Sequence, residues 1–247
     1  MPDTAALHFA EFPLQPADFT ASLGATVVVA PHPDDESLGC GGLLALLRRA
    51  GQPVHTVLVS DGTMSHPNSL RFPAPARRAL REAELREALE ILGVETAQTL
   101  HMGLPDGAVP TAKATGFAAA VEQLSAYLEA HQPQTLLVPW RRDPHPDHRA
   151  TSQLVHAACA RLTASPRLLE YVVWAWERAD PAELPQPSEV RGWRLDISSV
   201  VALKQQAIAA HRSQLLPIID DDPAGFQLSE GMLAHFAQPF EVYLEAV

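Results

Sequence analysis

Cysteine is scarce in this chain of 247 residues, which contains only Cys40 and Cys159. Two cysteines are too few for a disulfide-stapled scaffold, and their separation does not match a C-x-x-C motif. We expect both to be small core residues of a protein that works in a reducing compartment.

Basic residues and long apolar runs are also lacking. The 18 Lys and Arg residues are outnumbered by 29 Asp and Glu residues, so the formal net charge is -11. Because affinity for nucleic acid rests largely on clustered Lys and Arg, we exclude nucleic acid as a partner. No apolar run reaches the roughly 20 residues that cross a bilayer, and residues 1–25 lack the basic flank and apolar core of a signal peptide. We therefore expect a cytoplasmic protein without stable membrane insertion.

What is present is the composition of a globular protein, with 47% hydrophobic and 19% charged residues. The length allows one large α/β domain or two small ones, and we favour a single domain over residues 1–247. Residues 1–25 are expected to form an irregular N-terminal arm, and residues 215–247 a C-terminal tail or lid. A homo-oligomer is compatible with this sequence.

Runs of β-branched residues alternate with segments of helical period along most of the chain. Predicted strands cover residues 26–30, 54–60, 96–102, 135–139, 168–176 and 193–197, and predicted helices cover residues 38–50, 74–92, 117–131, 149–162 and 200–211. Such alternation predicts βαβ units and a mainly parallel sheet. If the first four strands have the doubly wound order 3-2-1-4, strands 26–30 and 135–139 are neighbours, and the loops at their carboxyl ends face each other across a crevice.

Both of these loops are rich in groups that bind metals. The first reads Pro31-His32-Pro33-Asp34-Asp35-Glu36, and the second contains His145-Pro146-Asp147-His148. Two imidazoles and one carboxylate, from His32, Asp35 and His148, form the ligand set of open catalytic zinc sites. A metal in such a site lowers the pKa of bound water to about 7 and polarises a carbonyl, which suits amide hydrolysis.

The remaining groups of the two loops then have catalytic roles. Asp34 is placed to act as general base, and His145 to stabilise the oxyanion or to protonate the leaving amine. Asp147 is expected to orient the ring of His145 through a hydrogen bond. The simpler alternative is that the acids cap the following helices, where the helix dipole favours them. Two such motifs at the ends of neighbouring strands argue against capping alone.

These two motifs resemble those of the PIG-L, or LmbE-like, family of metal-dependent N-acetylglucosaminyl deacetylases, and the resemblance extends from about residue 26 to residue 214. It implies a Rossmann-like three-layer fold with catalytic loops at the ends of strands one and four. It also implies His32, Asp35 and His148 as ligands of Zn²⁺, with Asp34 as base and His145 as second catalytic group. The implied substrate is a small-molecule acetamido sugar or glycoconjugate.

Less specific resemblances to the same family lie outside the two loops. Arg81, followed by Glu84, resembles an arginine that reaches the substrate, and Asp106 resembles an acid that binds sugar hydroxyls. Lys204 and residues 211–214 resemble a C-terminal signature, in which we expect His211 only to support the catalytic residues. Arg81 as a surface charge and Asp106 as a turn acid are the simpler alternatives. Residues 66–73 are expected at the pocket rim, and Asp220 to Asp222 are expected to be solvated.

Other functions remain open at this point. An amidase acting on another sugar-linked amide, such as a thiol conjugate, would use the same residues. A non-haem iron oxygenase also uses two histidines and a carboxylate, and Fe²⁺ is possible in place of Zn²⁺. A nucleotide-binding module would use Gly39, Gly41 and Gly42, whose spacing matches neither common phosphate-binding motif. A sugar-binding protein without catalytic activity is the last alternative, and the presence of Asp34 argues against it.

Overall fold

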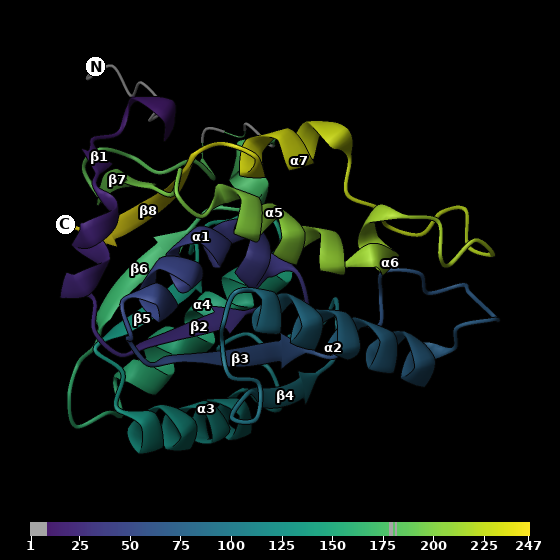
Figure 1. The fold of residues 1–247 in the computed structure, drawn as a ribbon. Coiled ribbons are helices and arrows are strands. Elements are labelled where there is room, and N and C mark those ends of the chain that lie inside the picture. Colours follow the sequence, from purple (N-terminus) through teal and green to yellow (C-terminus); the bar gives the residue numbers. More distant parts are fainter. Residues whose placement is uncertain (1–8, 178–179, 181) are drawn as a thin grey trace.

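The computed structural model describes residues 9–177, 180 and 182–247, and Figure 1 shows their arrangement around one sheet. The sheet has eight strands in the order β1-β7-β8-β6-β5-β2-β3-β4. Their bounds are β1 Leu14–Gln15, β2 Thr26–Ala30, β3 Val54–Ser60, β4 Leu100–Leu104, β5 Thr135–Pro139, β6 Arg167–Tyr171, β7 Val190–Asp196 and β8 Phe240–Ala246. Neighbouring strands are parallel except where β8 pairs antiparallel with β6 and β7.

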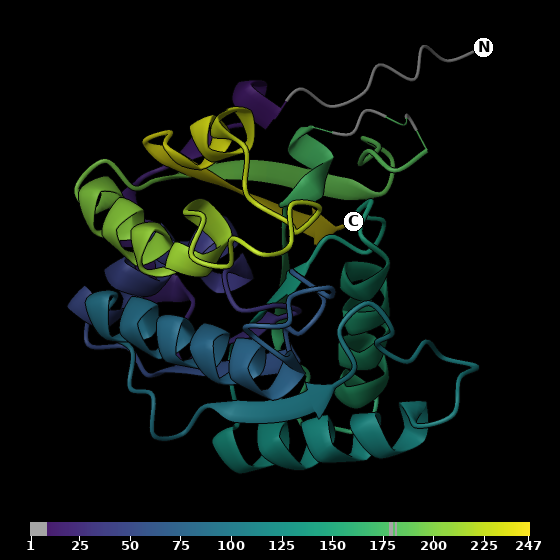
Figure 2. The same cartoon turned by 90° about the vertical axis from the view of Figure 1, so that its right-hand side faces the viewer.

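Helices cover both faces of this sheet. Their bounds are α1 Asp35–Arg49, α2 Ala74–Ile91, α3 Phe117–His131, α4 Pro146–Cys159, α5 Val201–Ala210, α6 Arg212–Leu215 and α7 Glu230–Phe236. Figures 1 and 2 show α1, α2 and α5 on one face and α3 with α4 on the other. The predicted three-layer α/β fold is confirmed.

Strand β2 is apolar throughout because both of its faces are covered, as is usual for a central parallel strand. Val28 belongs to the core under α1, α2 and α5. Its neighbours Val27 and Val29 belong to the second core, under α3 and α4. β2 pairs with β3 on one side and with β5 on the other, so the predicted order 3-2-1-4 is confirmed as β4-β3-β2-β5.

Several element bounds differ from the prediction. α4 begins at Pro146 rather than at residue 149, because proline has the backbone angles of a first helical turn and needs no amide partner there. α1 likewise begins at Asp35, with acids in its first turn. β6 ends at Tyr171, and the aromatic run that follows forms the short helix η3, Trp174–Trp176. β4 lies at Leu100–Leu104 instead of residues 96–102.

Segments near both ends of the chain, predicted to be an irregular arm and a tail, contribute strands to the sheet. Residues 9–25 of the predicted arm include β1 and two short 3-10 helices, while residues 1–8 lie outside the described residues. In the segment predicted as a tail or lid, residues 240–246 form β8, which lies between β7 and β6. β8 hydrogen-bonds strands on both sides, and this long-range pairing is not visible in local periodicity.

The glycines of α1 allow close packing within the fold. A Cβ atom on Gly39 would lie 2.4 Å from the ring of Tyr171, and one on Gly42 would lie 2.7 Å from Ile197. A Cβ on Gly41 would lie 3.1 Å from Lys204. Because these glycines face neighbouring side chains inside a buried helix, they have a packing role and do not form a phosphate-binding loop.

Cys40 is buried and Cys159 is partly buried, and both thiols are free. Of the helices that the structure describes, none combines the length and the apolarity needed to cross a membrane.

Candidate active site

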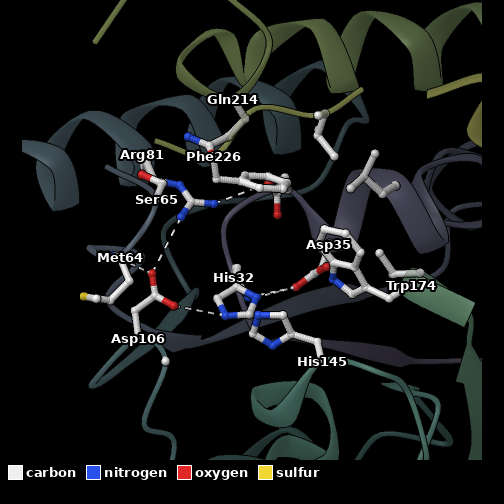
Figure 3. A pocket seen from close by; sticks show the side chains of 15 residues that line it. His32, Asp35, Met64, Ser65, Arg81, Asp106, His145, Trp174, Gln214 and Phe226 are labelled. Carbon is white, nitrogen blue, oxygen red and sulfur yellow. Dashed lines mark hydrogen bonds and ion pairs between the residues drawn. The ribbon is translucent and has the colours of Figure 1, made fainter. Parts of the chain in front are cut away.

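A pocket of about 200 Å³ opens at the carboxyl ends of β2 and β5. Figure 3 shows the side chains that surround it. The charged and titratable groups in its wall are His32, Asp34, Asp35, Arg81, Asp106 and His145. The strand order therefore brings residues that are more than a hundred positions apart to one site.

The carboxylate of Asp35 lies between two histidines. Its Oδ2 is 3.2 Å from Nδ1 of His32 and 3.2 Å from Nε2 of His148. Asp35 is in the first turn of α1 and His148 is in the first turn of α4, so the two loops place these groups from opposite sides of the crevice. All three residues are buried.

The other nitrogen of each histidine faces a second carboxylate. Nε2 of His32 is 3.2 Å from Oδ2 of Asp147 and 3.2 Å from Oδ1 of Asp106. Nδ1 of His148 is 3.4 Å from Oδ1 of Asp143. Outer carboxylates that hold the far nitrogen of a histidine are typical of metal sites, where they fix the ring and its tautomer. In this arrangement Nδ1 of His32 and Nε2 of His148 are directed toward the same carboxylate oxygen.

Three observations fit a metal held by His32, Asp35 and His148. The two N–O separations of 3.2 Å are close to the edge of about 3.3 Å expected between tetrahedral zinc ligands at about 2.0 Å. Both ring nitrogens of His148 are buried, and each lies near a carboxylate oxygen without the angles of a good hydrogen bond. The donor set of imidazole and carboxylate suits zinc and iron(II) alike.

Two other groupings around His32 bring one ligand atom from each residue close together. One ligand atom each from His32, His145 and His148 lie within 4.8 Å of one another, and so do those of His32, Asp106 and Asp147. Asp147 and Asp106 face the nitrogen of His32 that points away from Asp35, so they fit the role of outer carboxylates better. The grouping with His145 shows that this ring lies directly beside the same center.

Asp34 points in a different direction from Asp35. Its Oδ2 is 3.3 Å from Nη2 of Arg81. Its φ of 143° is an uncommon conformation for a residue other than glycine, so the surrounding contacts must hold it. Burial raises the pKa of Asp34 to about 6, although the positive charge of Arg81 opposes this shift. The two neighbouring aspartates therefore have separate partners and separate electrostatic environments.

Glu36 holds the backbone of Asp34 in this conformation. Its Oε2 accepts a hydrogen bond of 3.0 Å from the backbone N–H of Asp34. Its Oε1 accepts from the hydroxyl of Ser37 at 2.6 Å and lies 3.0 Å from Nε2 of His211. Glu36 and His211 are both buried, so neither exchanges these partners for water. This places His211 behind Asp34, in the supporting position expected from the sequence.

Glu36→Gln is expected to lower kcat by about tenfold to a hundredfold. An amide in place of the carboxylate sets its NH₂ group against the N–H of Asp34 or against the donors Ser37 and His211, and small misplacements of a reacting group cost rates of this size. Steady-state kinetics with stoichiometric metal measures the effect. Glu84→Gln is the matched control, because Glu84 is buried and bonds Ser213 without touching Asp34. Equal losses of kcat in the two variants would contradict this role.

The structure gives the carboxylate of Asp147 a partner that differs from the predicted one. The sequence predicts that Asp147 holds His145, but its carboxylate faces His32 and accepts from the backbone N–H of Gly107 at 2.7 Å and of Val109 at 3.2 Å. Those loop amides draw the side chain away from His145. Instead, the backbone N–H of Asp147 donates to Nδ1 of His145 at 3.2 Å.

This contact determines the form of the His145 ring. Because Nδ1 accepts a hydrogen bond, the proton of a neutral ring is on Nε2. Burial and the charges of His148 and His32 lower the pKa of His145 to about 4, so the ring is neutral at pH 7. A neutral ring with its proton on Nε2 is a hydrogen-bond donor toward the pocket that it lines.

Arg81 and Asp106 both line the pocket. Nη1 of Arg81 donates to the carbonyl of Gly62 at 3.0 Å, and Nη2 donates to that of Pro33 at 2.9 Å. Asp106 accepts from the N–H of Met64 at 2.7 Å. Although burial alone would raise the pKa of Asp106, contacts with His32 and Arg81 lower it to about 2. Arg81 is buried and is therefore not the surface charge of the simpler alternative, whereas Asp106 does lie in a turn, where its carboxylate faces His32.

The residues that resemble the C-terminal signature of the family do not all lie at the pocket. Lys204 forms a buried ion pair with Glu241 of β8 at 2.7 Å, while Gln214 lines the pocket. Asp221 and Asp222 accept hydrogen bonds from residues 68–71, so these acids join two loops and are not simply solvated.

Sequence reasoning missed two features of the site. Asp143, which supports His148, is fully buried and also accepts from the backbone N–H of Trp174 at 3.1 Å. Its position five residues before a predicted ligand was the available signal. The aromatic side chains of Trp174 and Phe226 also line the pocket, and their local sequence gives no such indication.

Residues 27–159 match the family model described as PIG-L, GlcNAc-PI de-N-acetylase. The chain is 30% identical over 260 residues to the 1D-myo-inositol 2-acetamido-2-deoxy-alpha-D-glucopyranoside deacetylase of Actinosynnema mirum, covering 89% of this chain and 91% of the relative. It is 28% identical over 201 residues to the probable N-acetyl-alpha-D-glucosaminyl L-malate deacetylase 2 of Bacillus cereus, covering 80% and 87%. The solved structure of N,N'-diacetylchitobiose deacetylase from Pyrococcus horikoshii shares the fold, with a TM-score of 0.66 and 22% identity over 82% of this chain and 74% of that one.

Proposed function

Because the chain belongs to the PIG-L family, we propose that it is a metal-dependent hydrolase that removes the acetyl group from an N-acetylglucosamine-containing small molecule or glycoconjugate. The observation that supports this most directly is the placement of the Asp35 carboxylate between His32 and His148, with Asp34 held separately beside it. The pocket thus offers three residues that could hold a metal and, separately from them, one carboxylate that could act as a base.

His32, Asp35 and His148 would hold the metal, which we propose to be Zn²⁺ with Fe²⁺ as a possible substitute. When bound, such an ion polarises the amide carbonyl and lowers the pKa of water. Asp143 and Asp147 act through the histidines, whose rings they orient. The protein thus supplies both the ligands and the groups that fix their tautomers.

Asp34 acts as the general base that takes a proton from the attacking water, and it then gives this proton to the nitrogen of the leaving amine as the C–N bond breaks. Its raised pKa makes it a stronger proton acceptor than an ordinary aspartate, and about 6 is close to the range where a base works best at neutral pH. The neutral ring of His145 donates its Nε2 proton in a hydrogen bond to the carbonyl oxygen as negative charge develops there. Arg81 and Asp106 position the sugar on the side of the pocket where they lie.

The alternative functions account for less of the site. A non-haem iron oxygenase would use the two histidines and Asp35, but it has no need for a second aspartate held by Arg81 and Glu36. A sugar-binding protein without activity would likewise leave Asp34 without a role. An amidase acting on another sugar-linked amide uses the same chemistry and differs only in the acyl group or aglycone.

The test is amide hydrolysis by purified protein of known metal content. We expect near-stoichiometric metal, release of a primary amine from N-acetylglucosamine conjugates, loss of activity on chelation, and recovery on addition of Zn²⁺ or Fe²⁺. Full activity after chelation and dialysis, with no metal detected, would overturn the proposal.

A further inference from the structure

The pocket contains several carboxylates but little positive charge. Among its lining residues that the structure describes, Arg81 is the only Lys or Arg, whereas Asp34, Asp35 and Asp106 are all present. The guanidinium of Arg81 already donates to the Gly62 carbonyl and contacts Asp34. Its charge is therefore already paired with Asp34, and both of its Nη atoms donate within the protein.

Two arginines near the pocket are also occupied, Arg71 in the loop of residues 62–73 and Arg77 in the first turn of α2. Arg77 is buried and donates from Nε to the carbonyl of Thr63 at 2.8 Å and from Nη1 to that of Phe72 at 2.6 Å. Arg71 is exposed and is paired with Asp220. Along the part of the chain that the structure describes, this rim offers an anionic ligand no uncommitted guanidinium.

The opposite wall is apolar. We call it the aromatic wall, and it consists of Leu38, Val173, Trp174, Phe226 and Leu228. The rings of Trp174 and Phe226 meet edge to face at 5.7 Å between centroids, and Trp174 is stacked beside His145 at 6.1 Å with 26° between the ring planes. Figure 3 shows Trp174 on the side of His32 opposite Asp106. The wall therefore begins beside the reacting center, on the side of His32 opposite Asp106.

Backbone contacts hold this wall in place. The N–H of Phe226 donates to the carbonyl of Ser65 at 2.6 Å. Asp221 accepts from the N–H groups of Leu70 and Arg71, both at 2.9 Å. Phe226 is thus fixed against residues 62–73 before any ligand binds, which lowers the entropic cost of using it as a contact surface.

Resting on the proposed function, we propose that the acetamido sugar of this enzyme carries a neutral, apolar aglycone that packs on the aromatic wall. A carboxylate or phosphate in that position would lose water against apolar side chains, and no Lys or Arg among the described lining residues is free to pair with it. The pocket therefore discriminates against anionic aglycones such as malate, which the name of the Bacillus cereus relative contains.

The test compares three substrates of the metal-loaded enzyme: octyl and methyl N-acetylglucosaminide and N-acetylglucosaminyl L-malate. We expect kcat/KM for the octyl conjugate to exceed that of the methyl conjugate by at least about tenfold, and that of the malate conjugate to be lower by a similar factor. A malate conjugate that reacts as fast as the octyl conjugate would overturn this inference and leave the proposed function intact.

Calorimetric binding to the Asp34→Asn protein separates the two proposals. If the wild type hydrolyses none of the three conjugates, the proposed function fails. Tighter binding of the octyl than of the malate conjugate then still supports the aromatic wall as a contact surface, and equal or weaker binding overturns it.

Two substitutions test the wall and the charge independently. Phe226→Ala is expected to reduce the octyl-to-methyl ratio of kcat/KM about tenfold, because it removes a ring from the wall. Met64→Arg places a cation at the mouth, where Met64 is 51% exposed, and is expected to raise the malate-to-methyl ratio about tenfold. Met64→Gln is the uncharged control of similar size and should not raise it. An unchanged ratio in Phe226→Ala or in Met64→Arg would contradict the inference.

Discussion

Asp34→Asn is expected to lower kcat for amide hydrolysis by about 10²–10⁴-fold while the protein keeps its metal, because this is the usual contribution of a general base. The amide is close to the carboxylate in size and has no site that accepts a proton under these conditions. Asparagine also tolerates positive φ better than most residues, so the uncommon backbone at this position is retained.

The measurement combines metal content, thermal unfolding and steady-state kinetics on the same preparation. Stability at pH 7 should not fall, because burial penalises the charged form of Asp34, as its raised pKa shows, and the amide carries no charge. Loss of metal from Asp34→Asn would place Asp34 among the ligands and contradict the division of roles between the two aspartates. Activity within a few fold of wild type would contradict its role as base.

His148→Ala has the second large effect, and we expect it to remove the metal together with activity. The side chain is fully buried, and its Nε2 faces the same oxygen of Asp35 as Nδ1 of His32 does. Loss of one of three ligands should weaken metal binding by more than the roughly 10–100-fold seen when only an outer partner is lost. Metal content after dialysis against a competing chelator measures this directly.

Two further variants show whether the effect is specific to the ligand. Asp143→Asn keeps His148 but weakens its outer contact, so metal affinity should fall by about 10–100-fold. His156→Ala removes an exposed histidine from the same helix and should leave metal content unchanged. A fully metal-loaded His148→Ala protein would contradict the proposed ligand set.

The alternation of strands and helices can be predicted from the sequence, because each β-branched run is followed by a segment of helical period. Parallel strands of this kind, such as β2, are covered by helices on both faces and must be apolar throughout. A short, continuous apolar run therefore identifies such a strand in the sequence. The outer part of the sheet is less visible. β8 is recruited from the last residues of the chain by hydrogen bonds to β6 and β7, and pairing over such distances has no local signal.

The sequence by itself determined which chemical groups come to the site. Motifs after two strands named two histidines and a carboxylate, and the rule that ligands bind beyond the carboxyl ends of parallel strands placed them together. The family resemblance, which the comparisons confirm, pointed to the same residues and to an acetamido sugar as substrate.

Only the tertiary structure decided which group faces which. Asp34 and Asp35 are adjacent in sequence, but the turn directs one toward Arg81 and the other toward two histidines. Asp147 turns to His32 because the amides of Gly107 and Val109 lie there. A side chain at the start of a helix takes its direction from donors supplied by distant segments. The sequence therefore specifies the groups of the site, and packing of remote loops specifies their partners.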